Sequence, residues 1–431
     1  MSNLYSRLIR HSGNQDLFRV VEMSVAALLH GRPFHIQAEG CRGTGKTTIM
    51  RAARELLPPI TRIKDCLYNC DPAAPHCPLH RHLSHEQIAV LGTEEVPRPF
   101  LEISQAAKLG TVVGSIDLAK LTNPTNPLAA LLPGTIPQAH RGIIFIDEIN
   151  RLADTTPELA DVLLDVMGTR PGRVQIEEPG LPVVELPVTV GIWAASNPDE
   201  DPGPLSRIRK QLADRFDLTV AMGRPDSYQA VVNILSGQDE GQEAAGNIRQ
   251  LSGSLDDIEV SPELRQLLGK IYLDFGLESL RSVAAMEAAA CLAALLAGSS
   301  AAGIAELRQV VPLALAHRVN ADTINAIMDY LNGLQCGQAG YHIPATESAE
   351  QRVARAVSRW GTVWSAFKVR LAALLQNRSW SSDFNTGGSG QGGLGGTQIA
   401  DPLKTTIIAP PKPALPIAHL PDEQLVTKEP K

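Results

Sequence analysis

The segment from Gly40 to Thr47, which reads GCRGTGKT, constrains the fold more than any other part of the chain. It matches the pattern G-x-x-x-x-G-K-[S/T] at every fixed position. Residues 34–38 before it predict a short strand, and residues 48–57 after it predict a helix that ends before Pro58. A strand, a glycine loop and a helix in this order form a phosphate-binding loop, because glycines let backbone N–H groups approach phosphate oxygens.

The loop predicts a binding site for ATP and Mg²⁺. We expect Lys46 to reach the β- and γ-phosphates and the Thr47 hydroxyl to bind the magnesium ion. An ordinary glycine-rich turn would not require the Lys-Thr pair at its end. The expected nucleotide-binding residues of the loop are Gly40, Gly43, Thr44, Gly45, Lys46, Thr47 and Thr48.

Two further strands are predicted to end in polar side chains. Residues 142–146 form an apolar run that is followed by Asp147 and Glu148. Parallel sheets bind ligands at the carboxyl ends of their strands, so we expect Asp147 to hold Mg²⁺ and Glu148 to act as the general base on the attacking water. A capping pair at a strand–helix turn is the alternative for these two acids. Residues 189–195 predict another strand, and Asn197 after it could orient the water and contact the γ-phosphate.

Composition excludes several classes of protein. The 431 residues are 44% hydrophobic and 20% charged, which indicates folded cores. The net charge of −7 and the lack of a basic stripe argue against a nucleic-acid partner. No uncharged apolar run reaches membrane-spanning length, and the closest candidate, 283–303, carries Glu287 and predicts a buried helix. The start of the chain has no signal-peptide pattern, and six unevenly spread cysteines suit a reducing cytoplasm.

The chain divides by pattern into five expected segments. Short apolar runs that alternate with helical patterns predict a parallel α/β sheet, and the Ala- and Leu-rich stretch after it predicts a helical domain. The segments are an N-terminal helical segment (1–33), a nucleotide-binding α/β core (34–235), a helical lid domain (240–335), an amphipathic helix (347–378) and a Gly- and Pro-rich disordered tail (379–431).

The helix expected over 347–378 carries an apolar seam with two tryptophans. Its residues step by three and four, as in a heptad pattern. The seam could dock onto the chain's own helical domain, or it could bind a partner subunit. Its members are Val353, Val357, Trp360, Trp364, Phe367, Leu371 and Leu374.

Cysteines and a histidine cluster between residues 66 and 80. The spacing Cys66-x₃-Cys70-x₆-Cys77-x₂-His80 offers four ligands that could hold a structural Zn²⁺ in a tetrahedral site. It is not the spacing of a standard zinc finger. Unligated loop residues, or a cluster or redox role, are the other interpretations.

Several strings together resemble the AAA+ ATPase subunit of magnesium chelatase, the I-type subunit of chlorophyll biosynthesis. The resemblance covers roughly residues 34–320 and rests on the phosphate-binding loop and on five further strings. These are 66–72 (CLYNCDP), 114–118 (GSIDL), 139–150 (AHRGIIFIDEIN), 161–167 (DVLLDVM) and 211–218 (QLADRFDL).

The resemblance implies a fold and further site residues. It implies an AAA+ P-loop NTPase with an αβα domain and a parallel sheet, followed by an α-helical lid. Asn197 matches the sensor-1 position, and Arg281 matches the sensor-2 position at a lid helix. Arg215 matches the arginine finger that completes a neighbouring subunit's ATP site, with Arg207 and Arg209 as nearby alternatives.

The resemblance also implies partners and an activity. It implies a homo-oligomeric ring, usually a hexamer, and a D-type partner subunit with a von Willebrand A-like domain. A β-hairpin expected over 174–177 and 183–186 would lie on the working face of the ring. The predicted function is Mg²⁺-dependent ATP hydrolysis that drives metal insertion into a tetrapyrrole or remodels a partner.

Three alternatives stay open. One is a MoxR-like chaperone that acts with a von Willebrand A-type partner on a metalloenzyme. A second is a relative of DNA-competence helicases, and a third is a regulatory ATP-binding module without turnover. The intact Lys46, Asp147 and Glu148 argue against the third. The chain departs from the family pattern at 107–111 and at His140. These departures argue against a role in the tetrapyrrole pathway more than they argue against ATP hydrolysis.

Overall fold

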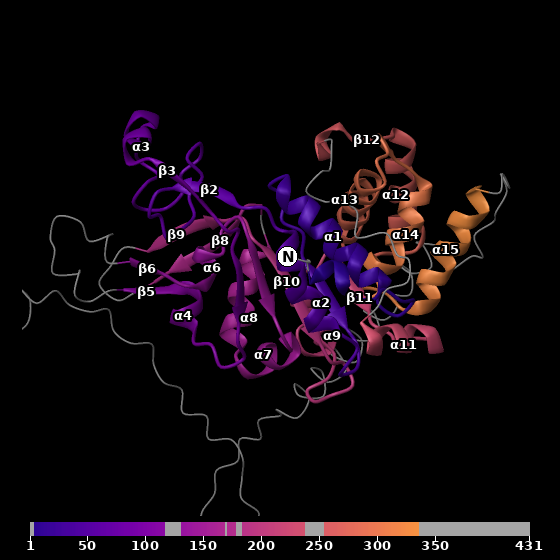
Figure 1. Ribbon diagram of the computed structural model, residues 1–431. Helices are drawn as coiled ribbons and strands as arrows, with labels where there is room; N and C mark the ends of the chain where they lie inside the picture. Colours follow the sequence, from indigo (N-terminus) through magenta and orange to yellow (C-terminus); the bar gives the residue numbers. More distant parts are fainter. Residues whose placement is uncertain (1–3, 117–130, 169, 178–182, 238–253, 336–431) are drawn as a thin grey trace, which may run out of the picture. The chain divides into compact units, whose positions relative to one another are not determined.

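The computed structural model describes residues 4–116, 131–168, 170–177, 183–237 and 254–335, all within one compact unit (Figure 1). The helix expected over 347–378, with its apolar seam, and the tail expected over 379–431 lie outside the described residues.

A five-stranded parallel sheet forms the centre of the nucleotide-binding core, as the alternating pattern predicts. The strand order is β11-β1-β10-β7-β4. The strand that precedes the phosphate-binding loop, β1, therefore pairs with β10, and β10 pairs with the strand that delivers the two acids, β7. The strands are β1 (Ile36–Glu39), β4 (Phe100–Ile103), β7 (Ile143–Ile146), β10 (Gly191–Ser196) and β11 (Leu218–Ala221).

Both faces of this sheet are covered, because alternate side chains of each strand enter two different hydrophobic clusters. Ile143 and Phe145 of β7 belong to the cluster that also contains residues of α1 (Gln15–Leu29) and α2 (Lys46–Ala52). Ile144 and Ile146 belong to the other cluster, with residues of α7 (Ile149–Thr155) and α8 (Pro157–Val166). This double burial explains why β7 and β10 read as continuous apolar runs rather than as alternating ones.

Shorter elements connect the central strands. The expected hairpin is confirmed, because β8 (Gly172–Ile176) pairs antiparallel with β9 (Val184–Val188). Two other antiparallel pairs are β2 (Ile60–Ile63) with β3 (Thr93–Val96), and β5 (Gly114–Ile116) with β6 (Leu131–Pro133). The remaining helices of the core are α3 (His85–Leu91), α4 (Leu109–Val113), α6 (Thr135–Gln138), α9 (Leu205–Ile208), α10 (Lys210–Ala213) and α11 (Tyr228–Ser236).

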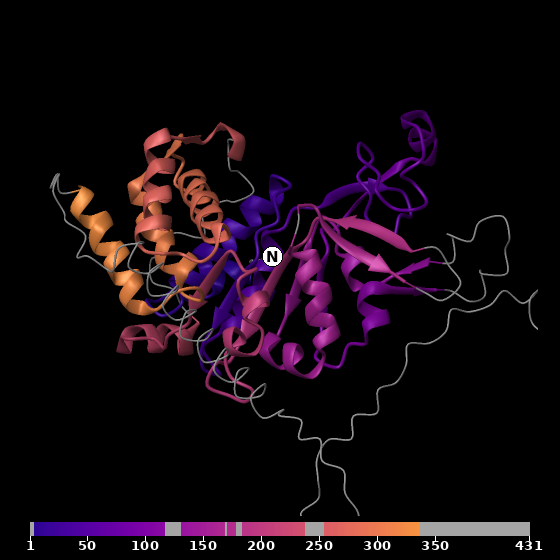
Figure 2. The same cartoon turned by 180° about the vertical axis from the view of Figure 1, so that it is seen from behind.

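The helical lid follows the sheet in sequence and appears in orange tones in Figure 2. Its central helix, α13, is rich in alanine, which permits close packing against α1, α12 and α14. Glu287 of α13 pairs with Arg265 at 3.1 Å, and α13 is a buried helix, as its sequence predicts. No helix among the described residues is long and apolar enough to cross a membrane. The lid contains α12 (Pro262–Asp274), α13 (Leu280–Leu296), α14 (Ile304–Leu315), α15 (Ala321–Gln335) and a short parallel pair, β12 (Glu259–Val260) with β13 (Ala301–Ala302).

The expected helical segment over 1–33 is only partly helical. A 3₁₀ turn, η1, covers Tyr5–Arg7 and α1 begins at Gln15, whereas residues 8–14 between them are not helical. The Asn14 side-chain oxygen accepts a hydrogen bond from the His11 N–H at 2.8 Å, and Gly13 packs so tightly on Gly223 that a Cβ there would lie 2.6 Å from its carbonyl carbon. The local Asn14 hydrogen bond and the tertiary contact with Gly223 together override the apolar periodicity that predicts a helix.

Candidate functional site

Three glycines give the phosphate-binding loop its shape. Gly40, Gly43 and Gly45 have backbone φ values of 155°, 76° and 88°, which residues other than glycine rarely adopt. A Cβ on Gly40 would also lie 2.8 Å from the carbonyl oxygen of Met222. The loop between β1 and α2 therefore depends on these glycines, and its backbone forms the concave turn that a phosphate group requires.

Lys46 lies at the centre of this loop. Its ammonium group donates hydrogen bonds to the carbonyl oxygens of Gly40 and Cys41, at 2.6 and 2.8 Å, and to the Asn197 side-chain oxygen at 2.8 Å. Burial lowers the pKa of Lys46, although the nearby carboxylate of Asp147 acts in the opposite direction. A cation held by neutral oxygens in this way suits an anionic ligand.

The two acids after β7 occupy different environments. The Thr47 hydroxyl contacts both carboxylate oxygens of Asp147, at 3.2 and 3.3 Å, so the two expected magnesium ligands lie side by side. Glu148 adopts a left-handed conformation with φ of 52°, which turns the chain from β7 into α7. Hydroxyl and carboxylate oxygens are the ligands that Mg²⁺ prefers, so this corner of the site fits that ion.

Residues that sequence patterns did not predict hold the Glu148 carboxylate. The Gln105 side-chain amide donates to it at 2.6 Å, and Arg151 and Arg42 lie 3.3 and 3.9 Å from it. Glu200 pairs with the same two arginines. Arg42 lies within the loop motif, at a position that the motif leaves free, whereas Gln105 follows the edge strand β4 and carries no local signal.

A cavity of about 230 Å³ collects most of the predicted residues. Gly40 lies beside this cavity through its contact with Lys46. Arg215 and Arg281 do not line it. The residues that line it are Arg42, Gly43, Thr44, Gly45, Lys46, Thr47, Thr48, Asp147, Glu148, Ser196 and Asn197.

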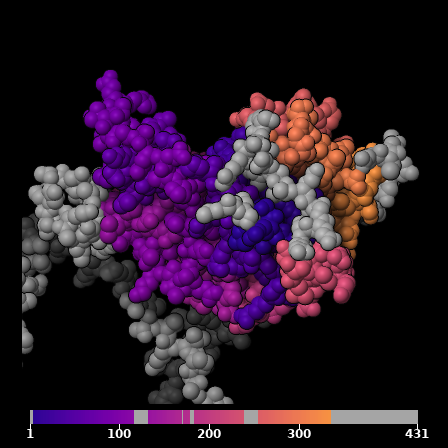
Figure 3. Space-filling model, viewed as in Figure 1, coloured from indigo at the N-terminus to yellow at the C-terminus, as the bar shows by residue number. Residues whose placement is uncertain are grey.

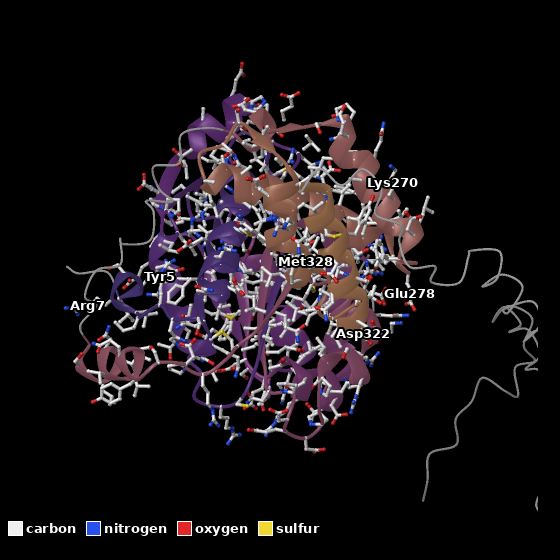
Figure 4. The ribbon with its side chains drawn as sticks, turned by 90° about the vertical axis from the view of Figure 1, so that its right-hand side faces the viewer. Tyr5, Arg7, Lys270, Glu278, Asp322 and Met328 are labelled. Carbon is white, nitrogen blue, oxygen red and sulfur yellow. The ribbon has the colours of Figure 1, made fainter. Side chains whose placement is uncertain are left out.

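A second cavity, of about 540 Å³, adjoins the first through the shared residues 42–45 and Thr48. Its walls come from Arg7, from the non-helical residues 8–14 and from the segment that includes α11. Leu8, Ile9 and Ile234 make part of this wall apolar. Figure 4 labels Arg7, which lines the cavity, and the neighbouring Tyr5. An apolar cavity that continues from a phosphate loop is suited to a nucleoside.

Arg215 and Arg281 lie close together in a cationic group. Burial lowers the pKa of Arg281, and the positive charge of the nearby Arg215 lowers it further. Arg281 donates to the Met167 carbonyl oxygen at 3.4 Å and lies 3.9 Å from the Asp214 carboxylate. Arg215 is half-buried beside Gly168, and among the described residues its side chain has no hydrogen bond or ion pair. The alternative Arg209 is already paired, with Asp161 at 3.2 Å.

Arg318 of the lid fixes the chain on both sides of Arg215. Its guanidinium donates to the carbonyl oxygens of Asp214 and Phe216, at 2.8 and 2.7 Å, and to the Asp214 carboxylate at 3.0 Å. The Asp217 carbonyl accepts a further bond at 3.3 Å. The Arg318 side chain is only 6% exposed, so these bonds form away from water.

Replacing Arg318 by Met should lower the free energy of unfolding by about 3–5 kcal/mol, because it leaves a carboxylate and buried carbonyl groups without their cation. The matched control is Arg265→Met on α12, where the exposed pair with Glu287 contributes about 1 kcal/mol or less. Urea unfolding of both variants measures the difference. Equal and small losses would show that the Arg318 bonds contribute little.

The four predicted zinc ligands also lie together. The ligand atoms of Cys66, Cys70, Cys77 and His80 are all within 4.8 Å of one another. They lie in the loop between β2 and α3, and none of them lines either of the two cavities beside the phosphate-binding loop.

A phosphate-binding loop, an acid pair and a polar strand end on neighbouring parallel strands, followed by a helical lid, define an AAA+ ATPase. In agreement, the AAA lid domain family matches residues 265–328. The chain belongs to the magnesium-chelatase 38 kDa (ChlI) subunit family. It is 31% identical over 307 residues to the magnesium-chelatase 38 kDa subunit of Acidiphilium rubrum, a match that covers 67% of this chain and 85% of that subunit.

Two further relatives match a similar share of this chain at lower identity. The subunit of the same name from Cereibacter sphaeroides is 28% identical over 302 residues, which cover 66% of this chain and 84% of the relative. The magnesium-chelatase subunit ChlI-2, chloroplastic, of Arabidopsis thaliana is 27% identical over 307 residues, which cover 67% and 70%. Membership of this family confirms the predicted ATPase class and implies the use of a nucleotide and Mg²⁺.

Proposed function

We propose that the chain hydrolyses ATP at the site between β1, β10 and β7, with Mg²⁺ held by Thr47 and Asp147. The contact between the Thr47 hydroxyl and the Asp147 carboxylate carries this proposal, because it joins two magnesium-type ligands at the end of the phosphate-binding loop. Bound Mg²⁺ supplies positive charge that neutralises phosphate oxygens. The adjoining apolar cavity takes the nucleoside.

Side chains of the chain itself carry out the other steps of ATP hydrolysis. Lys46 donates N–H bonds to the phosphates, and Asn197, which contacts Lys46, orients the water beside the γ-phosphate. Glu148 accepts the proton of that water as general base. Gln105 positions the Glu148 carboxylate through the 2.6 Å hydrogen bond.

Arg215 and Arg281 act at the site of a neighbouring subunit in a homo-oligomeric ring. Neither lines the cavity of its own chain, and Arg215 has a guanidinium group without a counter-charge among the described residues. Arg318 holds the main chain on both sides of Arg215, which fixes the backbone position of the proposed arginine finger. An arginine supplied from a neighbour stabilises the negative charge that develops on the transferred phosphoryl group.

The work of this ATPase is metal insertion into a tetrapyrrole, together with a D-type partner subunit. The relatives that support this assignment are named as subunits of magnesium chelatase. A MoxR-like role on a metalloenzyme is the alternative. Affinity purification of the chain from its own cells separates them, since a large porphyrin-binding subunit would support chelation and a lone von Willebrand A protein would support remodelling.

Calorimetry tests nucleotide binding directly. The chain should bind ATP with an affinity that rises when Mg²⁺ is added, and Lys46→Ala should weaken binding about 10- to 150-fold, because charge-assisted hydrogen bonds to phosphate are lost. Arg54→Ala, at an exposed basic residue after α2, is the control that should bind normally. Equal affinities of all three proteins for ATP would contradict the proposed site.

A further inference from the structure

The loop between β2 and α3 contains a buried group of thiols that ATP hydrolysis does not use. Cys66, Cys70 and Cys77 are 2%, 0% and 0% exposed, and His80 is half-buried beside them. The Cys77 sulfur lies 3.3 Å from His80 Nδ1. Figure 1 labels the flanking elements β2 and α3, and Figure 3 shows that this part of the chain, in violet, reaches the molecular surface.

The distances fit a single ion. All four ligand atoms lie within 4.8 Å of one another. A tetrahedral zinc ion with Zn–S bonds of about 2.3 Å and Zn–N bonds of about 2.0 Å holds its ligands slightly closer than this, so small side-chain rotations complete the site. Two irons bridged by sulfide would need ligands that lie farther apart, because the ligands bind different metal atoms.

Backbone N–H groups point at the sulfur atoms. The N–H groups of His76 and Cys77 donate to the Cys70 sulfur at 3.4 and 3.3 Å. Donors of this kind stabilise thiolates, which are the form of cysteine that binds metal.

Turn geometry and a second layer of contacts hold the loop in place. Asn69, between Cys66 and Cys70, has a φ of 53°, and its side-chain amide donates to the Gln138 carbonyl oxygen at 2.6 Å. His76 lies 3.3 Å from the Cys70 sulfur through Nδ1 and stacks on His140 with ring centroids 3.8 Å apart. The ligands therefore have positioned neighbours, as ligands of metal sites do.

The same loop is tied to the chain that leads into β7. Arg141 pairs with Asp71 at 3.1 Å and donates to the Thr61 carbonyl oxygen at 2.7 Å. Arg62 donates to the Cys66 carbonyl oxygen at 3.1 Å. Since β7 delivers Asp147 and Glu148 at its other end, the loop braces the amino end of the strand on which catalysis depends.

We propose that Cys66, Cys70, Cys77 and His80 bind one structural Zn²⁺ ion that fixes the β2–α3 loop against the start of β7. The ion closes the loop by joining the four ligands directly, in addition to the weak sulfur contacts and the hydrogen bond from the His80 N–H to the Cys77 carbonyl oxygen at 3.1 Å. It has no open position for substrate, because four protein ligands complete a tetrahedral zinc site.

Metal analysis of the purified full-length chain tests the proposal. The wild type should contain about one zinc per chain, and Cys70→Ser and His80→Ala should lose most of it. His80→Cys should keep the ion, because a fourth thiolate replaces the imidazole. The matched controls, His82→Ala and Cys41→Ser, change exposed residues outside the group and should keep a full complement of zinc.

Two further measurements use the wild-type protein, so they test the proposal even if a variant fails to fold. Replacement of zinc by cobalt in the wild type should give the visible absorption of a tetrahedral cobalt–thiolate site, and a chelator should lower the melting temperature of the wild type but not of His80→Ala. Zinc-free wild-type protein that does not take up zinc, a chain with acid-labile sulfide, or a disulfide among the three cysteines would each overturn the proposal.

Discussion

Glu148→Gln should bind ATP with near wild-type affinity and hydrolyse it about 10²- to 10⁴-fold more slowly, because a neutral amide cannot accept the proton of the attacking water. The substitution preserves the shape of the side chain, and its amide oxygen can still accept the hydrogen bond from Gln105. The ion pairs with Arg151 and Arg42 are partly exposed, so their loss should cost about 1 kcal/mol or less. Steady-state phosphate release and ATP calorimetry measure the two properties separately.

The control for this variant is Glu200→Gln. Glu200 pairs with Arg42 and Arg151, as Glu148 does, but it lies in the loop after Asn197 and does not line the phosphate cavity. Its replacement should change hydrolysis far less. If both variants lost turnover equally, the arginine pairs rather than the base would explain the effect, and unchanged turnover in Glu148→Gln would exclude this residue as the base.

Arg215→Ala should lower ATP hydrolysis about 10³-fold and leave nucleotide binding intact, because an arginine finger stabilises charge that exists only in the transition state. The effect should appear in a ring, where the finger of one chain serves the site of the next. Arg209→Ala and Arg207→Ala should have smaller effects, since Arg209 is already paired with Asp161 and Arg207 is exposed. Turnover of each assembled variant is the measurement.

Mixed rings show whether the finger acts between chains. When Lys46→Ala and Arg215→Ala chains are combined equally, about a quarter of the interfaces place an intact phosphate loop beside an intact finger, and activity should partly return. Mixing Lys46→Ala with Glu148→Gln is the control, because both changes damage the same chain's site and no interface becomes intact. Equal recovery in the two mixtures, or none in the first, would argue against shared sites.

Local patterns predicted the parts of the site that follow directly after a strand. The phosphate-binding loop, the two acids after β7 and Asn197 after β10 each depend on fewer than about ten consecutive residues, and glycine and β-strand preferences act over that range. The N-terminal segment was harder to predict. Leu8 and Ile9 match a helical pattern, but they belong to an irregular segment and line a cavity. Contacts with Gly223, more than 200 positions away, decide that conformation.

By itself, the sequence determined the class of this protein and predicted which residues form its phosphate-binding loop, its acid pair and its thiol group, because each of those signals is contiguous in the chain. Only the tertiary structure decided that β10 lies between β1 and β7, which brings Asn197 to within 2.8 Å of Lys46 across 151 positions. It also decided that Gln105 holds Glu148 and that Arg318 clamps the chain beside Arg215. Strand order and lid packing depend on burying apolar surface between distant segments, and such pairings have no signature in any single stretch of sequence.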